Sequence, residues 1–455
     1  MASNREFQIF AKPVGAVCNL ACLYCYYLGK DSITRRQEDR VANNGGQSEK
    51  LRSEFDGSSP FPGIDSECSV HEKVPPEKSS ITMSDSILER YIIQHIEAST
   101  RSEVSFSWHG GEPLMAGIDF YRKVIDLQKK NIPPGKKIVN GLQTNGTLLN
   151  DEWCGFLSKE KFFVGVSIDG PEKFHNIYRK NLNGQSSFRK VMNGIELLKK
   201  YAVTFELLCV VHAGNAGNPM DVYRFLRGLG AGYMTFLPLV IKDPKSKDGI
   251  GKHSVPSEAF GNFMISVFDE WVANDIGKIK IQLFEEAART AFDQDHTLCI
   301  FKKECGGVPV VELNGNFYSC DHYAEPEYLV GNIMDTGLDE LLDSEVQKNF
   351  GRLKLNTLPR YCINCEVREM CNGECPKNRL LKTPDGEEGL NYLCAGYKKF
   401  FNHAKPFINA VATTWRNQNK VVKPNPPDSN MTSADISRNA PCPCGSGKKY
   451  KRCCL

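Results

Sequence analysis

A loop of three closely spaced cysteines near the start of the chain constrains this protein more than any other feature. Cys18, Cys22 and Cys25 stand at C-x-x-x-C-x-x-C spacing, and two tyrosines follow them. Three thiolates on one tight loop can hold three irons of a cubane iron–sulfur cluster, whose usual ligand set is four cysteines. The missing fourth ligand leaves a position open for a substrate or cofactor, as at catalytic metal sites. Three buried free cysteines are the plain alternative, but the regular spacing argues for metal.

The composition narrows the class of protein further. The 455 residues suffice for two or three domains, and 57 basic against 54 acidic residues leave a net charge of +3, which does not favour nucleic acid as a partner. The 18 cysteines gather at C-x-x-C-type spacings, which favours metal sites over disulfides. The first ten residues form no apolar signal region, and no apolar run reaches the ~18 residues of a membrane span. We therefore expect a protein of the reducing cytoplasm.

Strand-like apolar runs alternate with amphipathic helical patterns through the first half of the chain. Such alternation predicts an α/β fold with a parallel sheet. Six units are too few for a closed eight-stranded barrel, so the pattern favours an open, partial (β/α)6 barrel. The expected strands are 8–14, 104–108, 137–143, 162–168, 204–212 and 233–240, and the expected helices are 85–98, 120–130, 151–159, 188–200, 221–230 and 257–274.

Two polar segments interrupt this pattern. Residues 29–80 are rich in Gly, Ser, Pro and charge and predict a long insertion directly after the cysteine loop. Residues 416–440 have the composition of a linker. The predicted organisation is a partial barrel (1–245), a helical connection (246–298), a cysteine-rich domain (299–403), a helix end with a linker (404–440) and a small tail (441–455).

Eight further cysteines follow in the second half of the chain. Their number equals two complete ligand sets for cubane clusters. Zinc is the rival metal for the C-x-x-C-x5-C-x3-C run, but a zinc ribbon would use four cysteines and leave four unexplained. Clusters are therefore favoured over zinc. The eight are Cys299, Cys305, Cys320, Cys362, Cys365, Cys371, Cys375 and Cys394.

Polar residues at the expected strand ends are the other candidates for a site. Gly110 and Gly111 permit close backbone approach to a ligand, and Glu112 can accept a hydrogen bond from an ammonium group. Arg179 can bind a carboxylate with two hydrogen bonds, and Asp321, fixed beside Cys320, suits a general base. Each has a plain alternative as a turn or surface residue. Because carboxyl ends of parallel strands share one rim, we expect the strand-end residues to face the cysteine loop.

Four cysteines gather in the last fifteen residues of the chain, in P-C-P-C-G-S-G-K-K-Y-K-R-C-C-L. Cys442, Cys444, Cys453 and Cys454 fit a structural zinc site, and so short a segment would depend on the metal to fold. Its basic residues suit an acidic protein surface or nucleic acid. A metal site that serves only to fold the tail is equally compatible with the sequence.

Together these motifs resemble the radical S-adenosylmethionine enzymes that carry a SPASM auxiliary-cluster domain, in particular the anaerobic sulfatase-maturating enzymes. The resemblance covers residues 7–403 apart from the insertion. The tail resembles the SEC-C motif, which binds zinc and an export chaperone at the end of the bacterial preprotein-translocase ATPase. An export chaperone is therefore an expected partner of the tail, since sulfatases are often exported.

The resemblance implies a role for each motif. Cys18, Cys22 and Cys25 would hold one [4Fe–4S] cluster, and S-adenosyl-L-methionine would occupy its open iron. Two more [4Fe–4S] clusters would be held, one by Cys299, Cys305, Cys320 and Cys375 and the other by Cys362, Cys365, Cys371 and Cys394. The interleaving of Cys375 is implied by the family, since spacing alone would group the nearest four. Residues implied at the cofactor are Tyr24, Gly110, Gly111, Glu112, Ser167, Arg179 and Val240.

The implied reaction is oxidation of a cysteine or serine in an unfolded sulfatase to Cα-formylglycine without dioxygen. A 5′-deoxyadenosyl radical would take a β-hydrogen, Asp321 would take the side-chain proton, and an auxiliary cluster would accept the remaining electron. A reduced flavodoxin- or ferredoxin-like protein would supply electrons. Two alternatives stay open: another SPASM peptide modifier, forming thioether cross-links or maturing a quinohaemoprotein, and an iron–sulfur electron carrier.

Overall fold

The computed structural model describes residues 3, 6–27, 82–419, 439, 448, 449 and 452. The predicted insertion 29–80 and the four tail cysteines lie outside these residues. The chain divides into two compact units, Met1–Ala404 and Lys405–Leu455. No helix in the described ranges has the length and apolar character needed to cross a membrane.

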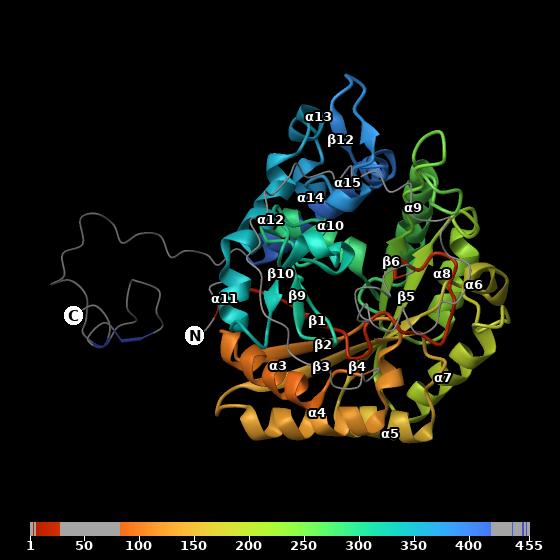
Figure 1. Ribbon diagram of the computed structural model, residues 1–455. Helices are drawn as coiled ribbons and strands as arrows, with labels where there is room; N and C mark the ends of the chain where they lie inside the picture. Colours follow the sequence, from red (N-terminus) through yellow and green to blue (C-terminus); the bar gives the residue numbers. More distant parts are fainter. Residues whose placement is uncertain are drawn as a thin grey trace. The chain divides into compact units, whose positions relative to one another are not determined.

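A ten-stranded mixed sheet organises the first unit, in the order β10-β9-β8-β1-β2-β3-β4-β5-β6-β7 (Figure 1). From β1 to β7 every neighbouring pair is parallel, which confirms the predicted open α/β sheet. The strands are β1 Phe10–Ala11, β2 Glu103–Trp108, β3 Lys137–Thr144, β4 Phe163–Ser167, β5 Thr204–Val211, β6 Tyr233–Pro238, β7 Lys280–Ile281, β8 Val310–Val311, β9 Asn316–Tyr318 and β10 Leu329–Asn332.

The six predicted strands are β1 to β6, but the first is shorter than the predicted 8–14. β1 ends before Pro13, whose nitrogen has no hydrogen to donate to a neighbouring strand. β1 pairs in parallel with β2 on one side and with β8 on the other. The cysteine-rich segment therefore extends the same sheet rather than forming a separate one, a long-range pairing that the strand pattern did not reveal.

Helices follow the strands where the sequence predicts them, and three of the predicted helices begin at side-chain or proline signals. The Ser84 side chain accepts from Ile87 N at the start of α3, the Asn150 side chain accepts from Trp153 N at the start of α5, and Pro219 occupies the first turn of α8. The helices of the barrel are α3 Asp85–Ala98, α4 Ile118–Asn131, α5 Asp151–Lys159, α6 Glu172–Tyr178, α7 Phe188–Lys200, α8 Pro219–Gly228, α9 Ser257–Asn274 and α10 Gln282–Arg289.

Short elements follow the barrel. The small sheet of β11 and β12 is separate from the main one. The long helix α15 crosses the boundary between the two units, and the predicted helix end before the linker corresponds to its last turns. The elements are α11 Leu338–Asp343, α12 Glu345–Asn356, α13 Arg360–Ile363, α14 Arg368–Cys371, β11 Leu381–Lys382, β12 Glu388–Leu390, α15 Cys394–Gln418 and the 3-10 helices Pro113–Ala116, Thr290–Phe292, Asp321–Tyr323, Pro326–Tyr328 and Pro376–Asn378.

Aromatic packing between α3, α4 and the sheet buries one face of the strands. Trp108 on β2 lies edge-on to Tyr91 of α3 and Tyr121 of α4, with ring centroids 6.0 and 5.8 Å apart. Its indole nitrogen donates to Asn140 Oδ1 on β3 at 3.0 Å, so the buried polar atom is satisfied. Successive side chains of a strand point to opposite faces of the sheet. Gln143 on β3 and Ser167 on β4 therefore face the side away from these helices.

Candidate active site

The cysteine loop lies directly against the turn that follows β2. Gly111 N donates to Gly15 O and Glu112 N donates to Val17 O, both at 2.9 Å. A Cβ on Gly111 would stand 2.2 Å from Val17 O, which no side chain permits. The two glycines are therefore required by the approach of the cysteine loop itself, a constraint that the sequence argument had assigned to a ligand.

The three thiols of this loop lie close together and half-buried. The thiols of Cys18, Cys22 and Cys25 are near enough to raise one another's pKa. Burial is the main cause, and it raises the pKa of Cys18 to about 11 and that of Cys22 to about 12. Leu20 N and Asn145 Nδ2 reach the Cys18 sulfur at 3.4 and 3.7 Å. Thiols with such pKa values ionise when a metal binds them, which is the chemistry expected of cluster ligands.

Glu112 connects the cysteine loop to the end of β3. It is fully buried, and its carboxylate accepts from Leu114 N at 3.1 Å, Thr144 Oγ1 at 2.8 Å and Asn145 N at 2.7 Å. Burial raises its pKa to about 7, against these hydrogen bonds, which lower it. A carboxylate has about four acceptor positions, so Oε2, which takes only the Asn145 donor, has room for one more hydrogen bond. Glu112 thus fits the ammonium group of an amino-acid cofactor.

Tyr24 and Arg179 meet at a buried carboxylate, Asp169, which is not among the predicted site residues. The Tyr24 hydroxyl donates to Asp169 Oδ2 at 2.5 Å, and Arg179 Nε donates to the same oxygen at 2.9 Å. Burial acts to raise the pKa of Asp169, but the charge of Arg179 outweighs it and holds that pKa below its ordinary value. Ser167, the last residue of β4, accepts from Gln143 Nε2 at 3.1 Å.

A buried nitrogen of His212 lies beyond the end of β5 without a hydrogen-bond partner. Gly214 N donates to His212 Nδ1 at 3.0 Å, so the ring proton of the neutral imidazole is on Nε2. That N–H has no acceptor in the described structure, and the Tyr178 ring beside it, edge-on at 4.6 Å, offers at most a weak contact. Because Tyr24 lies 6.4 Å away, this donor adjoins the cysteine loop. An unsatisfied buried donor at a strand end fits a bound cofactor.

Asp321 lies in a buried ionic cluster beside the same loop. Its Oδ1 is 2.6 Å from Lys12 Nζ, and Lys12 also contacts Glu312 Oε1 at 2.7 Å. The hydroxyls of Tyr26 and Tyr27 donate to Asp321 Oδ2 at 2.5 and 3.0 Å. Burial alone would raise the pKa of Asp321, but the charge of Lys12 holds it well below the usual range. Asp321 is therefore a carboxylate at neutral pH.

Aromatic and histidine side chains surround this carboxylate. His109 stacks on Phe10 with centroids 4.8 Å apart, and its Nδ1 lies 3.1 Å from the Tyr27 hydroxyl. Burial lowers the pKa of His109, so the ring is neutral. Tyr26 is 39% exposed, whereas Tyr27 is 6% exposed. Tyr26 therefore lies on the solvent-facing side of this group of residues, and Tyr27 lies inside it.

The eight later cysteines gather into two groups. The pKa of Cys305 is raised by burial and by Cys375, Cys320 and Cys299. These are the members of the first implied set. The thiols that raise the pKa likewise belong to the same set for Cys299, Cys320, Cys375, Cys362, Cys371 and Cys394. The second set is Cys362, Cys365, Cys371 and Cys394, and its four members line a single pocket.

The spacing within these groups bears on which metal they hold. In the described ranges, no group of three or more His, Cys, Asp or Glu side chains converges on a point that suits one metal ion. A single zinc needs all four ligands within about 2.0–2.3 Å of one centre. A cubane cluster instead takes one sulfur ligand on each of its four irons. Each of the two sets has the four thiols that such a cluster takes.

Val240 and the tail cysteines are the predicted site residues to which the structure gives no role. Val240 lies two residues beyond the end of β6 and has no polar contact to define a role. The tail cysteines lie outside the described residues. Four other residues of the site were not predicted from the sequence: Lys12, Glu312, Asp169 and His212. A lysine directly before the cysteine loop was a visible signal, but its partners are 300 and 309 positions away.

Family models match three parts of the chain. The radical SAM superfamily model matches residues 13–226, the iron-sulfur cluster-binding SPASM domain matches 305–366, and the SEC-C motif matches 438–455. These ranges contain the cysteine loop, four of the later cysteines and the cysteine-rich tail.

Curated proteins and solved structures match nearly the whole chain. A serine-type anaerobic sulfatase-maturating enzyme of Bacteroides thetaiotaomicron is 41% identical over 91% of this chain and 93% of its own length. A cysteine-type anaerobic sulfatase-maturating enzyme of Clostridium perfringens is 30% identical over 89% of this chain and 98% of its own. The structure of native anSMEcpe with bound AdoMet and Cp18Cys peptide has a TM-score of 0.73 at 29% identity, and covers 90% of this chain and 100% of that chain.

Proposed function

Since the chain belongs to the anaerobic sulfatase-maturating enzymes, a family of radical S-adenosylmethionine enzymes with a SPASM domain, we propose that Asp321 is the base of its reaction. The reaction is oxidation of a serine or cysteine in a sulfatase peptide to Cα-formylglycine. The observation that carries the assignment is the position of Asp321, ionised and buried, beside the loop of Cys18, Cys22 and Cys25.

The three cysteines of this loop would hold the cluster, and the bound cluster and S-adenosylmethionine supply a radical that removes a hydrogen atom from the β-carbon of the target residue. The protein's own part is to orient the target and to accept its proton. Lys12 keeps Asp321 ionised and holds its Oδ1, so that Oδ2 faces the hydroxyls of Tyr26 and Tyr27. A substrate hydroxyl can replace one of these tyrosines as the hydrogen-bond donor to Oδ2. When Asp321 takes the proton, the net charge of Lys12, Glu312 and Asp321 changes from −1 to zero.

Cofactor binding would draw on the strand ends. Glu112 would accept from the amino group of the methionine moiety, with Gly110 and Gly111 forming the wall beside it. Arg179, Tyr24 and Ser167 would lie along the cofactor, and Val240 would line its adenosyl portion. His212 adds a donor that suits a ribose or adenine acceptor, because its Nε2–H is buried and unsatisfied.

The two auxiliary sets would carry the electron away from the substrate. Cys299, Cys305, Cys320 and Cys375 would hold the nearer cluster, because Cys320 directly precedes Asp321. Cys362, Cys365, Cys371 and Cys394 would hold the other, in the pocket that they line. A reduced flavodoxin- or ferredoxin-like protein would be the electron donor in the cytoplasm.

Serine is the proposed target residue of the natural substrate. The serine-type relatives are 41% and 32% identical to this chain, whereas the cysteine-type relatives are 30% and 27% identical. The test incubates reduced, reconstituted protein with S-adenosylmethionine and peptides carrying S-x-P-x-R or C-x-P-x-R. Formylglycine from the serine peptide supports the proposal, and formylglycine from the cysteine peptide alone contradicts it. 5′-Deoxyadenosine with a different peptide product would indicate another peptide-modifying reaction, and neither product from a protein with full clusters would indicate an electron carrier.

The tail is proposed to bind zinc through Cys442, Cys444, Cys453 and Cys454 and to dock on an export chaperone. The support is the SEC-C match at residues 438–455 and the basic residues among these cysteines. Docking of this kind would present an unfolded sulfatase to the active site before export. Deletion of residues 441–455 should remove about one zinc per chain and reduce client modification in cells. Unchanged modification in cells would contradict the docking role.

A further inference from the structure

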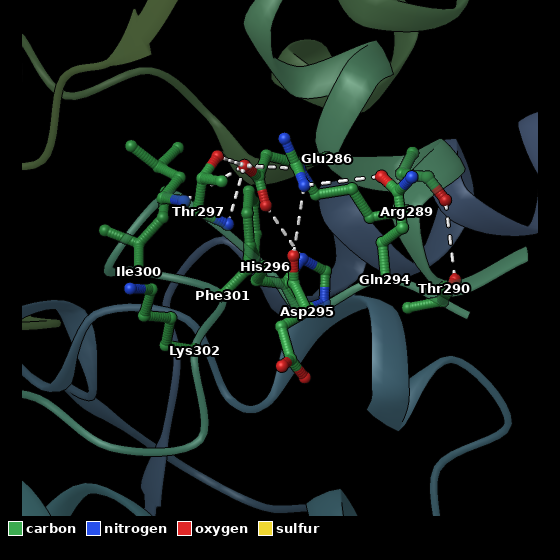
Figure 2. Close-up of polar contacts among 12 residues, drawn as sticks. Glu286, Arg289, Thr290, Gln294, Asp295, His296, Thr297, Ile300, Phe301 and Lys302 are labelled. Carbon is green, nitrogen blue, oxygen red and sulfur yellow. Dashed lines mark hydrogen bonds and ion pairs between the residues drawn. The ribbon is translucent and has the colours of Figure 1, made fainter. Parts of the chain in front are cut away.

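The loop that carries Cys299 is held on one side by a buried carboxylate. Glu286 on α10 accepts from Thr297 N at 3.1 Å, Leu298 N at 3.0 Å and the Thr297 hydroxyl (Figure 2). His296 Nδ1 lies 2.8 Å from the same carboxylate, and its Nε2 lies 2.8 Å from Glu369 O. The amide groups that precede Cys299 are thus fixed to α10 by one anion.

The same loop is held on its other side by a buried cation, Lys354 of α12. Its Nζ donates to Cys299 O at 3.0 Å, Ile300 O at 2.7 Å and Lys302 O at 2.5 Å. An ammonium group has three hydrogens, so these carbonyls use all of its donors. Lys354 is 0% exposed. Helix α12 is held against the set of Cys299 at a second point, where Cys305 N donates to Gly351 O at 3.1 Å.

The contacts of Lys354 satisfy its hydrogens but not its charge. A buried charge is stable only when an opposite charge compensates it, and carbonyl groups are neutral. The ionisable groups whose negative charge would act on Lys354 are Cys305, Cys299 and Cys375, followed by Glu374, whereas burial lowers the pKa of Lys354. Three of these four belong to the first auxiliary set. A cubane cluster bound there by four thiolates would carry a net negative charge at the same place.

We propose that Lys354 is the counter-cation of the auxiliary cluster held by the set of Cys299, and that its charge raises the reduction potential of that cluster. The inference rests on the proposed function only for the presence of the cluster. A nearby fixed cation stabilises the more negative, reduced state, and net charge is one of the factors that set cluster potentials. Lys354 is thus a positioning residue that also tunes electron acceptance.

The role fits the electron balance of the reaction. Conversion of the target CH2–OH to CH=O removes one hydrogen atom, one proton and one electron. In the proposed reaction the bound cofactor would supply the acceptor of the hydrogen atom, Asp321 would take the proton, and the set of Cys299 would hold the cluster that receives the electron. A higher potential at this cluster favours that last transfer.

The test is a redox titration of the full chain, reconstituted anaerobically, followed by electron paramagnetic resonance. A Cys22→Ala background removes the signal of the cysteine-loop cluster and leaves the two auxiliary midpoints. Lys354→Met should move one midpoint to a more negative potential and leave the other unchanged, whereas Lys354→Arg should keep both. Arg352→Met is the matched control, because Arg352 is an exposed cation on the same helix, paired with Glu345. It should shift neither midpoint.

Lys354→Gln separates charge from hydrogen bonding, because its amide still donates to the carbonyls. If Met and Gln variants both lose about four irons per chain while Arg keeps them, the charge is required and the proposal stands. Both midpoints unchanged in a fully loaded Met or Gln variant would overturn it. Loss of iron in all three variants would also overturn it, since the loop would then need only the shape of lysine. Iron analysis of the unaltered protein checks separately that the clusters of the proposed function exist.

Discussion

Replacing Asp321 with asparagine tests the centre of the proposed chemistry while preserving its shape. In the structure, Oδ1 faces the Lys12 ammonium and Oδ2 faces two tyrosine hydroxyls. An asparagine should turn its carbonyl oxygen to Lys12, which can only donate, and its NH2 to the hydroxyls, which can also accept. Lys12 keeps Glu312 as its ion-pair partner at 2.7 Å. We therefore expect the side chain to stay in place.

The charge of the site changes even though its shape does not. The unaltered group of Lys12, Glu312 and Asp321 carries −1 and gains a proton during the reaction, whereas the Asn variant carries zero and has no basic oxygen. Loss of a positioned general base costs about 10²- to 10⁴-fold in rate, which corresponds to about 3–5 kcal/mol of transition-state free energy. Cofactor cleavage precedes this proton transfer and should fall far less.

The assay measures 5′-deoxyadenosine and formylglycine from the same reaction with the serine peptide. Asp321→Asn should form 5′-deoxyadenosine with little formylglycine, so the ratio of product to cleaved cofactor falls by at least tenfold. Glu325→Gln is the control, because Glu325 is an exposed carboxylate four positions away, and its ratio should equal that of the unaltered enzyme. If Asp321→Asn retains a third or more of the formylglycine yield, Asp321 is not the base.

Three further predictions concern the rest of the site. Cys22→Ala should abolish cofactor cleavage and remove about four irons per chain while the auxiliary spectra persist; retained cleavage would exclude the three-cysteine site. Affinity for S-adenosylmethionine, measured by equilibrium dialysis, should weaken as pH falls from 8 to 6, because Glu112 has a pKa of about 7 and loses its charge on protonation; Glu112→Gln should bind weakly at both pH values, and a pH response that persists in this variant would assign it to another group. His212→Phe should weaken cofactor binding by about tenfold, the worth of one hydrogen bond of about 1.4 kcal/mol, without changing iron content, and unchanged affinity would remove His212 from the cofactor site.

The local sequence pattern was enough to predict most of the helices and strands of the barrel. The helices 85–98, 151–159, 188–200 and 257–274 have the predicted bounds, because apolar periodicity and capping residues act within a few positions of one another. The largest departure among the predicted strands is β1, which ends shortly before Pro13. The short strands β8, β9 and β10 were not predicted, since strands of two to four residues give little alternation to read.

The later cysteines show where sequence order and spatial order differ. Spacing alone groups Cys375 with Cys362, Cys365 and Cys371, whereas the tertiary structure places its thiol beside those of Cys299, Cys305 and Cys320. The resemblance to a family predicted this grouping, because members of a family share a fold. Chain spacing cannot supply it, since a loop can return a residue to any partner at a small cost in closure entropy.

By itself the sequence determined the chemistry available to this protein: three closely spaced cysteines, eight further cysteines that suffice for two sets of four, and an acidic residue beside one of them. The tertiary structure decided how that chemistry is controlled. Lys12 meets Glu312 and Asp321 across about 300 positions of chain, and the charge of Lys12 holds Asp321 in its ionised form. Such effects depend on distance in space and on exclusion of water, and neither quantity is written in the order of the residues.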